Sequence, residues 1–284
     1  MTETATPVRT TAQNAQLALL LEVSSTPKPG NVDREREYDD LRFEHFVAGA
    51  VGAFDGLKLA TEGGPLGRAF ERAVAGMSQQ RGGNTQFGAI LLLIPLVRAA
   101  STGRLTQARA RDIVASTTVE DAIDFYRAFD HISVAVDDPP PETTLPDVRL
   151  GADAAADLRD RELTFGDVMS ASVDVDGIAR EWAQGFPRTF DAATALQSGE
   201  GPVTHRAASV YLRLLASHVD TFVVTQHDEE TAREVRNRAQ QVLDGDGNVS
   251  DLAAAFVERK INPGTTADIV AGALFVALEG GMEV

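Results

Sequence analysis

The segment Asn262-Pro263-Gly264-Thr265-Thr266-Ala267-Asp268 leads directly into an apolar run at 269–278, with the sequence IVAGALFVAL. A proline–glycine turn is followed by hydroxyls and then an acid. This order has the character of a capping box, in which side chains bond the free amides of a first helical turn. The segment therefore predicts a helix over 266–278 that is capped by its own side chains.

Outward from this run, apolar residues recur at helical spacing along nearly the whole chain, and alternating patterns typical of strands are short. The predicted fold class is all-α, with residues 1–284 forming a single multi-helix, bundle-like domain. Asp137-Asp138-Pro139-Pro140-Pro141 predicts an acidic, proline-rich surface loop or hinge near 135–148, because consecutive prolines cannot continue a helix. The other expected helices cover residues 11–23, 43–60, 65–75, 85–100, 106–116, 119–129, 151–161, 165–172, 177–184, 189–197, 203–217, 229–243 and 249–259.

The charge balance limits the partners that the chain can have. There are 42 acidic and 26 basic residues, and the formal net charge of -16 disfavours nucleic acid and anionic membranes as partners. Only Lys28, Lys58 and Lys260 are lysines, and all other basic residues are arginines. Concentrated salt screens the self-repulsion of such an acidic surface, so the composition predicts a protein from a salt-loving organism.

Cysteine is absent, which excludes disulfides, thiolate metal sites and a cysteine nucleophile. The first residues show no basic-then-apolar signal, and no uninterrupted apolar stretch approaches the roughly 20 residues of a membrane helix. We therefore expect a cytoplasmic protein without a membrane partner. The assembly state stays open, with a homodimer as one option.

The most unusual segment is Thr26-Pro27-Lys28-Pro29-Gly30-Asn31-Val32-Asp33-Arg34, which reads as a stiff loop after a helix. Two prolines fix their φ angles, and Gly30 permits close approach of the backbone. A compact ammonium on a rigid loop suits a phosphate, which makes Lys28 a candidate phosphate ligand. The alternative is a plain connector between helices with a solvated lysine.

Two further segments could hold parts of an anionic ligand. Asp39 and Asp40 precede a predicted helix, where they could act as caps or hold a magnesium ion on a nucleotide's phosphates. Arg81-Gly82-Gly83-Asn84-Thr85-Gln86-Phe87-Gly88 is a glycine-rich turn that runs into a helix, and Asn84 could accept a bond from one of its free amides. Together with the turn at 262–268, three such turns suggest helix N-termini that converge on a polyanion.

These motifs carry a family resemblance. The loop from Thr26 to Arg34 is similar to the signature T-P-K-P-G-L-V-D-R of triphosphoribosyl-dephospho-CoA synthases, and Asn84-Thr85-Gln86-Phe87-Gly88 resembles their N-T-H-K-G. The segment at 262–268 resembles their late S-P-G-G-S-A-D, and Asp220-Thr221-Phe222-Val223 resembles D-S-F-V. The chain is thus identified as a divergent member of this family, of haloarchaeal character, although residues 133–201 match nothing in it.

The resemblance implies an all-helical transferase for which ATP is the ribosyl donor. The 2′-hydroxyl of dephospho-CoA displaces adenine, and Mg²⁺ accompanies the ATP. The implied catalytic residues are Asp33, Asp40 and Asp268, and the tentative magnesium ligands are Asp39 and Asp40. The implied ATP-binding residues are Lys28, Pro29, Gly30, Asn31, Arg34, Gly83, Asn84, Thr85, Gly264 and Thr266.

The sequence also departs from the family pattern. Glu37-Tyr38-Asp39-Asp40-Leu41 stands where bacterial members have G-A-H-x-D-M, and Gln86 and Phe87 replace the histidine and lysine of the second signature. Replacing a lysine by phenylalanine removes a cation and should change which substrate fits. Two alternatives therefore stay open: a ribosyl transferase for another cofactor precursor, such as a pterin, and a non-catalytic ATP-binding protein on the same scaffold.

Overall fold

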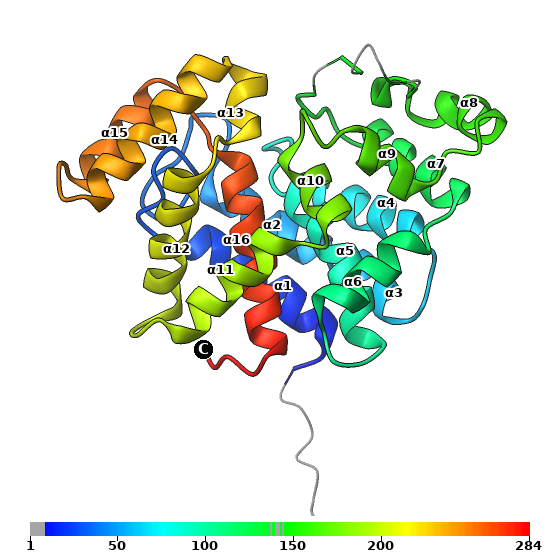
Figure 1. Cartoon of the computed structure of the whole chain (residues 1–284), viewed down its shortest axis with the longest axis horizontal. Coiled ribbons are helices and arrows are strands. Elements are labelled where there is room, and N and C mark those ends of the chain that lie inside the picture. The colour runs from blue at the N-terminus through cyan, green and yellow to red at the C-terminus, as the bar shows by residue number, and fades with distance from the viewer. Residues whose placement is uncertain (1–8, 137, 140–142, 144) are drawn as a thin grey trace, which may run out of the picture.

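The computed structural model describes residues 9–136, 138–139, 143 and 145–284, and every regular element among them is a helix (Figure 1). The all-α prediction is confirmed for this part of the chain. The helices of the first half are α1 (Thr11–Ser24), α2 (Phe43–Gly52), α3 (Phe54–Thr61), α4 (Leu66–Met77), α5 (Phe87–Ser101), α6 (Gln107–Ala115), α7 (Val119–Arg127) and the 3₁₀ helix η1 (Ala128–Asp130). Those of the second half are η2 (Val148–Ala154), α8 (Ala155–Asp160), α9 (Phe165–Ala171), α10 (Gly177–Gln184), α11 (Pro187–Ser198), α12 (Val203–Ser217), α13 (Thr221–Gln226), α14 (Glu229–Leu243), α15 (Val249–Glu258) and α16 (Gly264–Glu279).

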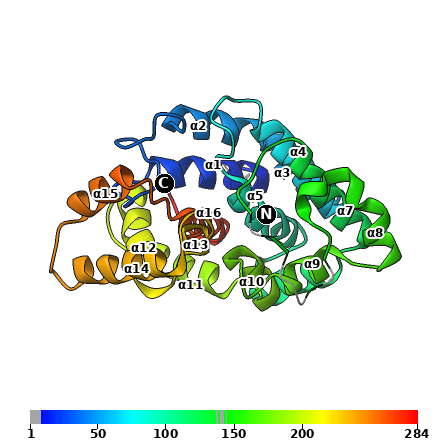
Figure 2. The same cartoon turned by 90° about the horizontal axis from the view of Figure 1, so that it is seen from above.

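Two apolar helices form the centre of the molecule. α16 runs through the middle and contacts α1, α5, α11 and α12, and the view from above shows α16 and α5 inside a ring of other helices (Figures 1 and 2). Both helices are apolar on nearly all sides, and most of their residues are buried. A helix of this kind is stable only when neighbours cover its whole circumference, which is why the other helices surround this pair.

Two of the predicted helices are divided in the structure. The predicted helix at 43–60 is wrong, because α2 ends at Gly52 and α3 starts at Phe54. Gly52 lies so close to the carbonyl of Gly76 in α4 that a Cβ would overlap it, and glycine itself favours a break in a helix. The predicted helix at 151–161 is divided as well, because residues 151–154 belong to η2 and α8 covers only Ala155–Asp160. Inside η2, Gly151 has a non-helical backbone with a φ of 53°, and a Cβ there would overlap the carboxylate of Asp130.

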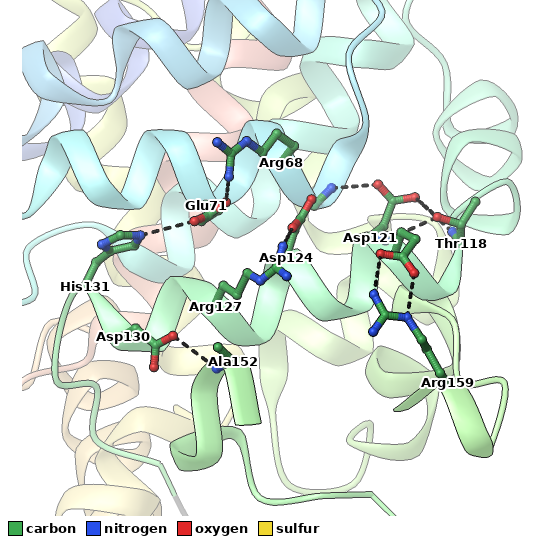
Figure 3. A network of polar contacts seen from close by, with 12 residues as sticks. Arg68, Glu71, Thr118, Asp121, Asp124, Arg127, Asp130, His131, Ala152 and Arg159 are labelled. Atoms are coloured by element: carbon green, nitrogen blue, oxygen red, sulfur yellow. Dashed lines mark hydrogen bonds and ion pairs between the residues drawn. The ribbon is translucent and has the colours of Figure 1, made fainter. Parts of the chain in front are cut away.

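A network of polar contacts joins α4, α7 and η2 (Figure 3). The Asp121 carboxylate caps its own helix through Thr118 and also accepts a 2.9 Å hydrogen bond from the amide of Gly67, at the start of α4. Asp130 accepts a 3.0 Å hydrogen bond from the amide of Ala152 in η2, and the imidazole of His131 lies 3.3 Å from the Glu71 carboxylate. These contacts fix the chain just before residues 133–136, which form part of a cavity wall.

Within the described ranges, no helix has both the length and the apolar character needed to cross a lipid bilayer. The centre of the predicted acidic loop, residues 137, 140–142 and 144, lies outside the described part of the chain.

Candidate active site

One cavity of about 430 Å³ brings together the three motif turns of the sequence. Asn31 lines it from the first turn, residues 84–88 line it from the second, and Asn262, Gly264 and Asp268 line it from the third. Asn31 in the first turn and Asn262 in the third are 231 positions apart along the chain. The three turns meet because α1, which precedes the first turn, and α5, which follows the second, both pack against α16, where the third turn lies.

Lys28 in the first turn is fully buried. Its ammonium forms an ion pair with the Glu22 carboxylate and donates a 2.7 Å hydrogen bond to Oδ1 of Asn31. The backbone amide of Lys28 donates to the Asp33 carboxylate at 3.1 Å, and Asp33 also accepts bonds from the amides of Glu35 and Arg36. Lys28 and Asp33 therefore hold the turn in shape, while Glu22 and Asn31 present their atoms to the cavity.

The first turn is fastened to the third. Gly30 has a left-handed φ of 78° and lies so close to the carbonyl of Ile261 that a Cβ would overlap it. Nδ2 of Asn31 donates to Oδ1 of Asn262 at 2.9 Å, and the hydroxyl of Tyr211 donates to the carbonyl of Pro29 at 2.9 Å. Glycine is required at position 30 by both its φ angle and this close packing.

Asp220 connects the N-termini of α13 and α16. Its carboxylate caps α13 through the amides of Phe222 and Val223, and it accepts bonds of 2.7 Å from both the amide and the hydroxyl of Thr266. The predicted capping box at 265–268 is therefore wrong: α16 begins at Gly264 without a side-chain cap of its own, and its first-turn amide is satisfied from α13. The hydroxyl of Thr221 lies 3.1 Å from that of Thr265 and accepts a bond from the amide of Gly177, so α10 joins the same junction.

Asp268 extends this junction to α5. Its carboxylate lies against Gly88 and accepts a hydrogen bond from the amide of Ala89, in the first turn of α5. A Cβ at position 88 would overlap the carboxylate, which explains why glycine occupies this position in the second motif. The predicted bond from Asn84 is also present, with the amide of Phe87 donating to Oδ1 at 3.1 Å.

Four carboxylates among the described residues line the cavity: Glu22, Asp138, Asp176 and Asp268. Glu22 is buried and Asp268 is partly buried, whereas Asp138 and Asp176 are exposed. Burial raises the pKa of Asp268 well above its usual value, and the nearby carboxylates of Glu22, Asp220 and Asp176 raise it further. Burial also raises the pKa of Glu22, against the opposing effect of the Lys28 ammonium. Partial desolvation raises the pKa of Asp176 as well, although this residue is exposed at the cavity wall.

No arginine, lysine or histidine is present among the described residues that line the cavity. An anionic ligand must therefore find its positive charge in helix N-termini or in an ion that it brings along. The other end of the cavity is apolar, since α7, α9, α10 and the described residues 133–136, 139, 145–146 and 148 supply mainly aliphatic and aromatic side chains. Among them are Phe125, Phe129, Val134, Leu145, Val168, Met169 and Ile178.

The predicted site residues fall into two groups. The first group lines the cavity and consists of Asn31, Asn84, Thr85, Gly264 and Asp268. The second group lies behind or outside it and consists of Lys28, Pro29, Gly30, Asp33, Arg34, Asp39, Asp40, Gly83 and Thr266. Asp39 and Asp40 are exposed on the loop before α2, and Arg34 is exposed at the end of the first turn.

Sequence reasoning missed Glu22 and Asp176 as lining residues, and it gave Asp220 no role of its own. Glu22 stands at the end of a predicted helix, immediately before the unusual loop, where it looks like an ordinary helical residue. Asp176 precedes the predicted helix at 177–184, and the structure shows it as the N-cap, with its carboxylate 2.7 Å from the amide of Ala179. A capping pattern alone did not indicate that this residue also faces a cavity.

Known proteins resemble the chain over most of its length. Two relatives named as probable 2-(5″-triphosphoribosyl)-3′-dephosphocoenzyme-A synthases come from Streptococcus equi subsp. equi and Lactiplantibacillus plantarum. The first is 25% identical and the alignment covers 92% of this chain and 93% of the relative; the second is 24% identical, with 94% and 95% covered. A crystal structure from Archaeoglobus fulgidus, titled as a triphosphoribosyl-dephospho-CoA synthase, aligns with a TM-score of 0.68. It covers 83% of this chain and 99% of the other, and at 23% identity it shows a shared fold alone.

The family model described as ATP:dephospho-CoA triphosphoribosyl transferase matches residues 8–283, which is nearly the whole sequence. The matched range includes all three turns that line the cavity. The chain therefore belongs to the ATP:dephospho-CoA triphosphoribosyl transferase family.

Proposed function

We propose that this protein transfers a 5-triphosphoribosyl group from ATP to the 2′-hydroxyl of 3′-dephospho-CoA and releases adenine. The observation that carries this proposal is the meeting of the three family motifs at one carboxylate-lined cavity. Gln86 and Phe87, which replace the histidine and lysine of the family motif, do not disrupt this arrangement. Both are buried at the start of α5, and both line the cavity.

The reaction breaks the bond between C1′ of the ribose and the adenine ring, and forms a bond from C1′ to the acceptor oxygen. The acceptor hydroxyl loses a proton, and the departing adenine gains one. Positive charge develops on the ribose in between, as in glycoside hydrolysis, where one carboxyl group donates a proton and a second carboxylate accepts one or stabilises the charge. Asp268, whose raised pKa favours its protonated form, suits the donor role, and Glu22, beside Lys28, suits the acceptor role.

The triphosphate needs positive charge that the described lining side chains do not supply. We propose that ATP enters as its magnesium complex and that its phosphates lie near the N-terminus of α5. No group of three or more acidic or histidine side chains among the described residues could hold a metal ion alone. Magnesium on a nucleotide needs only one or two protein carboxylates. Asp176 lines the cavity and therefore fits that role better than Asp39 and Asp40, which do not line it. Since ATP and dephospho-CoA are made inside cells, we place this activity in the cytoplasm.

The direct test is incubation of the protein with MgATP and dephospho-CoA in concentrated KCl, followed by quantification of free adenine and mass analysis of the acceptor. We expect one adenine for each triphosphoribosylated acceptor. Adenine release with a pterin precursor and none with dephospho-CoA would move the assignment to another acceptor. ATP binding by calorimetry without any adenine release would identify a non-catalytic ATP-binding protein and refute the proposal.

A further inference from the structure

The only lysine of the first motif is placed where a substrate cannot reach it without moving the protein. Lys28 is fully buried, and its ammonium contacts Glu22 and Asn31, both of which line the cavity. An ammonium has three donor hydrogens, and these two partners use two of them. Lys28 itself is absent from the described lining of the cavity.

We infer that Lys28 is a positioning residue that holds the Glu22 carboxylate and the Asn31 amide at the cavity wall, and that it makes no contact with the phosphates of ATP. The inference rests on the proposed function, since the group that Lys28 positions is the proposed proton acceptor.

The effect of Lys28 on Glu22 is one of charge as well as position. Three other groups act on this part of the molecule: Asp33 in the first turn, Asp268 on α16 and Tyr211 on α12. None of them can offset the burial of a carboxylate, because none carries a positive charge. Lys28 is thus the cation that lowers the pKa of Glu22 against the larger, opposite effect of burial, and so favours a carboxylate that can accept a proton.

The effect of Lys28 on Asn31 is one of orientation. An ammonium can only donate hydrogen bonds, so the Asn31 atom that faces Nζ at 2.7 Å must be the carbonyl oxygen. The amide nitrogen then points the other way and donates to Oδ1 of Asn262 at 2.9 Å. Lys28 therefore also fixes the hydrogen bond by which the first motif is joined to the third.

Nucleotide binding separates this role from a phosphate contact. The dissociation constants of MgATP, MgADP and AMP are measured by calorimetry for the wild type and for Lys28→Met. The matched control is Lys58→Met, which removes an exposed lysine that also pairs with a glutamate, Glu62. We expect all three nucleotides to bind within about 3-fold of the wild type in both variants. A phosphate contact at Lys28 predicts instead a loss of about 10-fold or more for ATP and little change for AMP, and that result would overturn the inference.

Turnover tests the connection through Glu22. In Lys28→Met we expect kcat for adenine release to fall by about 100-fold or more, with the KM for ATP nearly unchanged. If Lys28 acts through Glu22, the double variant Lys28→Met/Glu22→Gln is no slower than Glu22→Gln alone, because the second change removes nothing further. Losses that multiply in the double variant would show that Lys28 acts independently of Glu22.

The test still gives an answer if the variant does not fold or if the wild type is inactive. If Lys28→Met fails to fold because it leaves Glu22 buried and unpaired, the double variant removes both charges, and its comparison with Glu22→Gln decides the question. If the wild type releases no adenine with any acceptor, the proposed function fails, and the role of Lys28 in phosphate binding is still decided by the three dissociation constants.

Discussion

At the scale of single residues, Asp268 destabilises the fold at neutral pH, although the proposed reaction needs its carboxyl group. Its carboxyl group is enclosed beside three other carboxyl groups, so its pKa is raised in the folded protein. A group with a raised carboxyl pKa releases its proton more easily when the chain unfolds. The protein therefore loses stability as the pH rises from the unfolded pKa, near 4, towards the folded pKa of Asp268.

We predict that Asp268→Asn stabilises the protein at neutral pH while it abolishes adenine release. Asparagine keeps an oxygen acceptor for the amide of Ala89 and has no charge to bury. The melting temperature should rise by about 2–4 °C at pH 7, and this gain should disappear as the pH falls towards 4. Thermal unfolding of both proteins across this pH range checks the prediction, and a variant that is less stable at pH 7 or still turns over would contradict it.

The residue scale also shows what could be predicted from sequence and what could not. Motif likeness correctly indicated that Asn31, Asn84 and Asp268 belong together, and they line one cavity. It also indicated Lys28 as a phosphate ligand, although the structure buries this residue behind the cavity wall. In the sequence, a lysine in a rigid loop looks the same whether its ammonium is buried or free. Burial and pairing depend on Glu22, six residues earlier in a neighbouring helix, and no local pattern reports that contact.

At the scale of elements, the junction of α13 with α16 depends on Asp220. This one carboxylate accepts hydrogen bonds from three amides and one hydroxyl, and two of these bonds cross between the helices. We predict that Asp220→Ala lowers the free energy of unfolding by about 2–4 kcal/mol, because buried donors at two helix starts lose their acceptor.

The matched control for this prediction is Asp228→Ala. Asp228 caps only its own helix, α14, with a 2.7 Å bond from the amide of Thr231. Loss of such an exposed cap should cost only about 1 kcal/mol. Denaturant titrations of the two variants give the comparison, and equal losses would show that Asp220 acts as an ordinary cap.

The prediction of helices succeeded where an apolar pattern extends over many residues, as in α5 and α16. It failed where a contact with a residue far away in the sequence determines where a helix begins or ends. The sequence predicts that α16 is capped by the hydroxyls and the acid of its own first turn. In the structure the acceptor for the Thr266 amide is Asp220, which lies 46 positions away in the chain. The short helix α13 escaped detection, since its six residues are too few to show a period. The break between α2 and α3 depends on the approach of Gly76, which also leaves no local trace.

At the scale of the whole molecule, the net charge of -16 sets how the protein responds to salt. The surface carries many arginine–carboxylate pairs, such as Arg159 with Glu120, but exposed pairs of this kind are each worth only about 0–1 kcal/mol. Screening of the overall repulsion should outweigh the weakening of these pairs.

We therefore predict that the melting temperature rises steadily as KCl is increased from dilute buffer to molar concentrations. The measurement is a thermal unfolding series in KCl, with sucrose as a control for general effects of cosolutes. A melting temperature that falls or stays constant with KCl would show that the acidic surface is not a source of instability in dilute buffer.

The whole account depends on one bound nucleotide at the meeting point of three distant turns. The most direct measurement is a crystal structure of the protein with MgATP. Our account predicts a single nucleotide that contacts Asn31, Asn84 and Asp268 in the cavity, while the ammonium of Lys28 stays on Glu22. A nucleotide bound elsewhere, or a Lys28 ammonium turned onto the phosphates, would contradict it.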